Sequence, residues 1–124
     1  MIIIDPGQRK FPRRQFNARV RVTDNVRGRH FSATAYDVNP FGMFVETRRA
    51  FSPGEVVSLN FPSPEGDYSL TVSGQVVRAV TAGEGPRTGF AVEFFDHEEW
   101  IFEELVSYVY GRDETHTIEV AVGV

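Results

Sequence analysis

Two short segments of this sequence carry the side chains best suited to bind a charged ligand. The first places four cationic side chains within six residues, in the run Arg9-Lys10-Phe11-Pro12-Arg13-Arg14. The second joins an acid, an amide, a proline and a glycine where a strand must turn, in the run Asp37-Val38-Asn39-Pro40-Phe41-Gly42. Guanidinium groups donate paired hydrogen bonds to phosphates, and such a turn exposes backbone N–H groups and short polar side chains. The two segments are therefore predicted to form the halves of one anion site.

The first segment is predicted to be an extended leader, defined here as residues 9–14. Pro12 lacks an N–H and clashes with a continuing helix, so the chain around it is bent or extended and can wrap around a ligand. A plainer interpretation stays open. The same run is typical of a solvated basic leader, and the acid and amide of the second segment are also ordinary turn residues.

The charge of the chain is unevenly distributed. The formal net charge is −4, yet residues 1–30 hold eight Lys or Arg and only two acids. One basic end on an acidic protein disfavours tracking along duplex DNA, which needs cations over a broad face, and favours a compact anion. Twelve of the 13 basic residues are arginine, whose planar fork suits bidentate contacts to phosphate or guanine. A GC-rich genome would produce the same skew.

Several classes of function are excluded or disfavoured. There is no cysteine, which excludes disulfides, thiolate catalysis and cysteine-based zinc sites. The three histidines share no ligand-like spacing, so no metal site is expected. The sequence shows no nucleophile elbow, P-loop or paired carboxylates, so we do not expect an enzyme. Met1–Ile4 is too short for a signal peptide core and no run is long enough for a membrane helix, which predicts a cytoplasmic protein.

The elements that must position these residues are mostly strands. A chain of 124 residues has the size of a single domain. Apolar residues alternate with polar ones in six stretches that are separated by turn formers. These stretches are Phe16–Thr23, His30–Val38, Gly42–Thr47, Glu55–Phe61, Tyr68–Val80 and Thr88–Phe94. Six short strands joined by turns predict an all-β core, an antiparallel sheet closed into a small barrel.

A helix is predicted to follow the last strand, from about His97 to Tyr110. Asp96 and Glu99 fit a capping box, and Gly111 is placed to end the helix. Its apolar face is predicted to cover an open end of the barrel with Trp100, Ile101, Leu105, Tyr108 and Val109. Within the tail, residues 111–124, the stretch Thr115–Val124 alternates again and is predicted either to add an edge strand, to pair with Ile2–Ile4, or to be disordered.

This arrangement resembles the PilZ domain family, bacterial receptors for the second messenger cyclic di-GMP. The resemblance rests on Arg9-x-x-x-Arg13, then Asp37-x-Asn39-x-x-Gly42, then the strand Gly89–Phe94 before a terminal helix. The family forms are Arg-x-x-x-Arg and Asp/Asn-x-Ser-x-x-Gly on a six-stranded barrel. The resemblance implies a PilZ-like domain over residues 9–110, with an extension at residues 1–8.

The resemblance also implies roles for individual residues. Arg9 and Arg13 would clamp the guanines and phosphates of the ligand, and Arg14 with Lys10 would add phosphate contacts. Asp37 would accept from a guanine N–H edge or fix an arginine. Gly42 would let the backbone turn close to the ligand. Apart from the resemblance, Arg78 is interpreted either as a surface charge or as facing the same mouth.

The departure from the family pattern is Asn39, where serine is usual. A serine hydroxyl donates to a ligand oxygen or caps a turn, whereas an asparagine amide is longer and brings both a donor and an acceptor. Loss of one charged hydrogen bond would cost roughly 1.5–3 kcal/mol, about ten- to a hundredfold in affinity.

Two functions follow from the resemblance. The first is a cyclic di-GMP receptor whose leader is ordered by the nucleotide and whose altered surface a partner protein reads, in motility, pilus or surface-behaviour control. The alternative is a PilZ-like interaction module that binds proteins of motility or polarity machinery without the nucleotide. Asn39 and the apolar tail favour the alternative. Arg9, Arg13, Asp37 and Gly42 favour the receptor.

Overall fold

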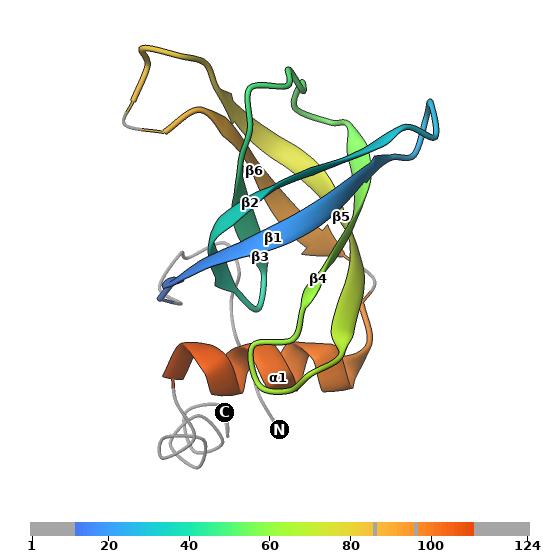
Figure 1. Cartoon of the computed structure of the whole chain (residues 1–124), viewed down its shortest axis with the longest axis vertical. Coiled ribbons are helices and arrows are strands. Elements are labelled where there is room, and N and C mark those ends of the chain that lie inside the picture. Colours follow the sequence, from blue (N-terminus) through green and yellow to red (C-terminus); the bar gives the residue numbers. More distant parts are fainter. Residues whose placement is uncertain (1–11, 86, 96, 111–124) are drawn as a thin grey trace, which may run out of the picture.

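The computed structural model describes residues 12–85, 87–95 and 97–110 (Figure 1). Six strands are followed by one helix: β1 Arg14–Asp24, β2 His30–Asn39, β3 Gly42–Glu46, β4 Val56–Pro62, β5 Ser69–Val80, β6 Gly89–Phe95 and α1 Glu99–Tyr110. Each strand begins and ends within two residues of its predicted bounds. The extension, the predicted capping residue Asp96 and the tail lie outside the described residues, as do Arg9 and Lys10.

The strands form a closed barrel in the order β1-β2-β3-β6-β5-β4, with every neighbouring pair antiparallel. β1 closes the barrel on β4, for example where Val22 lies opposite Leu59. The predicted six-stranded antiparallel barrel is confirmed. Closure pairs the edges that an open sheet would expose.

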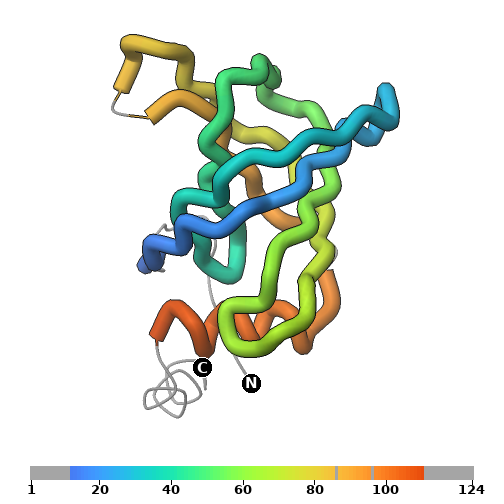
Figure 2. The backbone as a smooth tube through the Cα atoms, viewed as in Figure 1, coloured from blue at the N-terminus to red at the C-terminus, as the bar shows by residue number. Residues whose placement is uncertain are grey.

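The core follows from the alternation in the sequence. On β1, Val20 and Val22 are fully buried while Arg19 and Arg21 are exposed. The largest fully buried side chains come from several strands and the helix, and include Phe61, Phe90, Met43, Leu59, Leu70 and Leu105. Figure 2 shows the β1–β2 hairpin turn and the helix at opposite ends of the barrel.

The helix covers one end of the barrel, as predicted, but its buried face differs. Ile101, Leu105 and Val106 are buried, whereas Trp100 is 47% exposed. The prediction that Trp100 faces the barrel is therefore wrong. Consecutive helical residues are rotated by about 100°, so burial of Ile101 turns Trp100 toward the side of the helix. No helix of the described residues is long and apolar enough to cross a membrane.

His97 connects the helix start to the β2–β3 turn. Its ring lies 5.9 Å from the rings of both Phe94 and Phe102, and the Pro40 carbonyl accepts a hydrogen bond from it. Its Nε2 atom is buried without a hydrogen-bond partner among the described residues. Burial lowers the pKa of His97, and the bond to Pro40 offsets only part of that shift.

Stability is therefore expected to fall as the pH drops below about 6.5, the pKa of an unfolded-state histidine, because the unfolded chain then binds a proton that the folded chain resists. The pKa of Asp24 is lowered mainly by hydrogen bonds from the backbone of Arg27 and Val26, so its contribution is lost at a lower pH. Urea unfolding at pH 7.5 and pH 5.5 checks this, with His97→Gln as the control. An equal pH dependence in His97→Gln would contradict the assignment.

Candidate functional site

An open pocket of about 550 Å³ lies on the barrel wall, between strands β2, β3, β5 and β6 and the β5–β6 loop. Three arginines line it, together with one aspartate, one glutamate and an aromatic side chain from each of β2 and β3: Arg13, Arg78, Arg87, Asp37, Glu84, Tyr36 and Phe44. Cations outnumber carboxylates in this lining. The pocket is therefore suited to an anion.

Arg13 is fixed at the mouth of this pocket. Its Nη1 atom donates to Asp37 Oδ1 at 3.0 Å, and the same oxygen accepts from the backbone N–H of Phe44 at 3.2 Å. Arg13 is 44% exposed at its side chain and Asp37 19%, so the guanidinium remains open to a ligand. Fixing an arginine is one of the two roles expected of Asp37.

Two β-bulges shape the pocket. The β2–β3 register shifts between Ala35 and Asp37, and the β5–β6 register shifts between Val76 and Arg78. Each shift inserts one extra residue, which breaks the alternation of a regular strand and turns consecutive side chains toward one side. Tyr36 and Asp37 consequently line the same pocket. Arg78 also reaches it, as the sequence indicated.

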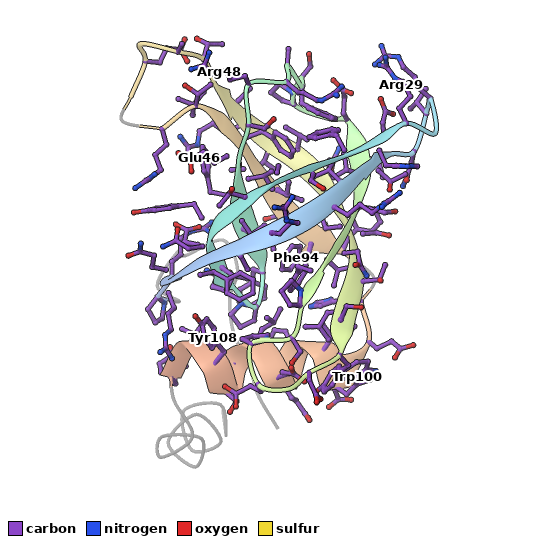
Figure 3. All side chains as sticks on the ribbon, viewed as in Figure 1. Arg29, Glu46, Arg48, Phe94, Trp100 and Tyr108 are labelled. Carbon is purple, nitrogen blue, oxygen red and sulfur yellow. The ribbon has the colours of Figure 1, made fainter. Side chains whose placement is uncertain are left out.

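Arg87 and Tyr36 are site residues that the sequence reasoning missed. The Arg87 guanidinium lies 3.5 Å from the centroid of the Tyr36 ring and donates to Glu46 at 3.0 Å. Figure 3 labels Glu46 on this side of the barrel. The available signal was the position of Arg87, directly after the loop that precedes the last strand. This stacked pair presents a flat, cationic surface to the pocket.

Asn39 closes the β2–β3 turn and does not line the pocket. Its Oδ1 atom accepts from the backbone N–H groups of Phe41 at 2.8 Å and Gly42 at 3.0 Å, and the residue is 7% exposed. This is an Asx turn, and a serine hydroxyl can form the weaker equivalent. The substitution of asparagine for serine therefore preserves the cap of the turn.

Gly42 is required by the neighbouring strand. A Cβ atom at this position would lie 2.1 Å from the carbonyl oxygen of Val92 on β6. The expected reason for this glycine was close approach to a ligand. The reason visible in the structure is the close approach of β3 to β6.

Arg14 is the first residue of β1, and its side chain contacts the helix whereas the side chain of Arg13 contacts Asp37. It donates to the carbonyl oxygen of Tyr108 at 2.7 Å, and its guanidinium lies 4.3 Å from the centroid of the Tyr108 ring. A cation at the last turn of a helix is favourable there. The described site therefore joins Arg13 and Asp37 with Arg78 and Arg87, while Arg14 lies against α1.

A closed six-stranded barrel with a helix over one end and an arginine–aspartate pair at an open pocket defines a small ligand-binding barrel domain. The chain belongs to the PilZ domain family, whose model matches residues 7–111. PilZ domains are ligand-binding effector domains, and the fold is one of cyclic di-GMP receptors. Among the described residues, no group of three His, Asp or Glu is placed to hold a metal ion.

Three solved structures share the fold. The inhibitor of motility MotI/DgrA of Bacillus subtilis is 16% identical with a TM-score of 0.70, over 86% of this chain and 51% of that one. The PilZ domain of YcgR from Escherichia coli, solved with cyclic di-GMP, is 16% identical with a TM-score of 0.61. The match covers 94% of this chain and 99% of that one. The PilZ domain of CeSA from a cellulose-synthesizing bacterium is 13% identical with a TM-score of 0.57. The match covers 82% of this chain and 98% of that one. This chain thus spans about half of the MotI chain. No curated protein sequence matches it.

Proposed function

We propose that this chain is a cyclic di-GMP receptor that acts in the cytoplasm by contact with a partner protein. The observation that carries the proposal is the Arg13–Asp37 pair at 3.0 Å, which holds a guanidinium at the mouth of a pocket also lined by Arg78 and Arg87. Cyclic di-GMP carries two negative charges and two guanine edges, both of which arginine binds through paired hydrogen bonds.

Arg9 and Arg13 clamp the nucleotide in this proposal. Asn39 and Gly42 hold the β2–β3 turn in shape, while Arg14 lies against α1. A charge pair at ~4 Å and an effective dielectric of ~20 gains about 4 kcal/mol before desolvation. Micromolar affinity needs about −8 kcal/mol net, so a few such contacts are sufficient. The similarity to MotI, which is an inhibitor of motility, supports a role in motility, pilus or surface-behaviour control.

The β2–β3 turn offers a route from the site to the helix. Phe94 donates its backbone N–H to the carbonyl of Phe41 at 2.7 Å, and the Phe41 ring lies 5.6 Å from the Phe102 ring. The Pro40 carbonyl accepts a hydrogen bond from His97. A ligand that moves this turn therefore also moves the start of α1, in addition to ordering the leader.

The alternative is an interaction module that does not bind the nucleotide. Asn39 favours it, because its Oδ1 atom is occupied by two backbone N–H groups and an amide cannot reproduce a hydroxyl donor at the same position. The two functions differ in one measurable property, which is affinity for cyclic di-GMP.

Calorimetric titration of cyclic di-GMP into the natural protein and into Asn39→Ser separates them. We expect the natural protein to bind at micromolar concentration and Asn39→Ser to bind with similar affinity, because a serine hydroxyl caps the same turn and residue 39 does not line the pocket. Cyclic di-AMP, with equal charge but adenine in place of guanine, is the matched control ligand. If neither protein binds cyclic di-GMP, the receptor proposal is wrong and the interaction module is favoured.

A further inference from the structure

An exposed aromatic pair lies on the surface where the β4–β5 loop meets α1. Tyr68 ends this loop and is 48% exposed, and Trp100 is 47% exposed with its ring centroid 6.2 Å from that of Tyr68. Figure 3 shows Trp100 and Tyr108 at opposite ends of α1. The aromatic pair is therefore at the far end of the helix from Arg14, which contacts Tyr108.

The aromatic pair is held in place by hydrogen bonds between the loop and the helix. The hydroxyls of Ser63 and Tyr68 both donate to the carboxylate of Glu104. The Ser63 hydroxyl oxygen also accepts from the backbone N–H groups of Glu65 at 3.1 Å and Gly66 at 3.0 Å, and Ser63 is 6% exposed. A surface fixed in this way loses little conformational entropy when a partner binds.

The surface around the aromatic pair is acidic on the side of the helix, whereas Arg19 and Arg21 share a groove with Tyr68 and Asp67 on the side of the barrel. The sequence has no Lys or Arg from residue 50 to residue 77 or from residue 88 to residue 110. Four exposed carboxylates belong to the same loop and helix or directly precede the helix: Asp67, Glu98, Glu99 and Glu103. In the described part of the chain, none of these four takes part in an ion pair. Because Arg19 and Arg21 lie in the groove of Asp67, the excess negative charge is on the helix side, at Glu98, Glu99 and Glu103.

We propose that the aromatic pair and these four carboxylates form a docking surface for a cationic segment of a partner protein, in which Lys or Arg alternates with apolar residues. Tryptophan and tyrosine attract Lys and Arg over their ring faces, and both are residue types on which binding energy concentrates. The carboxylates attract the same cations and repel nucleic acid and anionic lipid. Phe95, 42% exposed at the end of β6, adds apolar surface at the same end of the helix.

This inference deepens the proposed function, since it assigns the partner contact to a surface, but it does not require nucleotide binding. None of the residues of the aromatic pair or the four carboxylates lines the pocket that contains Arg13. Nucleotide and partner can therefore be bound at the same time, and each can be tested without the other.

The test is fluorescence anisotropy of a labelled, designed helical peptide of leucine and lysine, titrated with the full chain. A leucine–glutamate peptide of the same length is the control. We expect saturable binding of the cationic peptide alone, with a change in the emission of Trp100, the single tryptophan of the chain. Trp100→Ala is expected to weaken binding at least tenfold, and Val26→Ala, which truncates an 82% exposed side chain at the distant β1–β2 turn, to leave it unchanged.

The charge contribution has its own matched pair. Glu99→Gln should weaken binding several-fold, while Glu55→Gln, which removes the same charge on the β3–β4 loop, should not. Equal weakening by both variants would show that only net charge matters and would overturn the docking surface. If the peptide binds only after Arg9→Ala with Lys10→Ala, the surface is occupied by this chain's own leader. If the chain forms a dimer that Trp100→Ala abolishes, the surface is occupied by a second copy. Either result would contradict the partner proposal.

The nucleotide titration and the peptide titration fail independently. Peptide binding without cyclic di-GMP binding would contradict the receptor and leave the docking surface standing. Cyclic di-GMP binding without peptide binding would overturn the docking surface alone.

Discussion

Replacing Arg13 by alanine is expected to abolish measurable binding of cyclic di-GMP and to leave the barrel folded. A guanidinium that makes two charged hydrogen bonds contributes roughly 1.5–3 kcal/mol for each, so its loss moves a micromolar complex beyond about 100-fold weaker affinity. The stability effect is small, because Arg13 is 44% exposed and a surface ion pair contributes about 0–1 kcal/mol. Calorimetry measures the affinity and thermal unfolding measures the stability.

Arg19→Ala is the matched control for Arg13→Ala. Arg19 is exposed on the outer face of β1 and lies outside the pocket of Arg13, so its removal changes the charge equally and leaves the site intact. Arg13→Lys separates charge from geometry, because lysine keeps the charge and loses the planar fork. Arg9→Ala is expected to behave like Arg13→Ala. Unchanged affinity for cyclic di-GMP in both Arg9→Ala and Arg13→Ala would contradict the proposed site.

The barrel was predictable because its information is local. Alternation of apolar and polar residues fixes which face of each strand is buried, and turn formers separate the strands. The orientation of Trp100 was not predictable in the same way. Both Trp100 and Ile101 fit a helical stripe, and the choice between them depends on contacts of the indole with Tyr68 and Glu98, which lie outside the apolar pattern.

The site was predictable only in part. Arg13 and Asp37 were indicated by residue type and order, and the structure brings them together. The bulges at Tyr36 and Val77 leave no mark in a period-two pattern, so the stacking of Arg87 on Tyr36 could not be anticipated. Asn39 was assigned to the ligand because of its motif, but whether it faces inward or closes the turn depends on backbone geometry that the motif does not contain.

Gly42→Ala is expected to destabilise the barrel severely. The added Cβ atom would lie 2.1 Å from the backbone oxygen of Val92, and only a shift of the β3 or β6 backbone can relieve this contact. Overpacking of this kind costs typically 1–3 kcal/mol, and more where backbone must move, so about 3 kcal/mol is a minimum estimate. For a domain of this size that lowers the melting temperature by about 10 °C or more. Calorimetric or circular-dichroism melting measures it.

Gly85→Ala is the control, because a Cβ atom there would meet its nearest neighbour, a side-chain carbon of Val80, at an ordinary 3.8 Å. The same experiment decides between the two reasons for Gly42. If the glycine serves strand packing, Gly42→Ala loses stability in the absence of any ligand. If it serves close approach of a ligand, the variant melts like the natural protein and loses only affinity for cyclic di-GMP. The 2.1 Å approach to Val92 favours the first outcome, since it is present without a nucleotide.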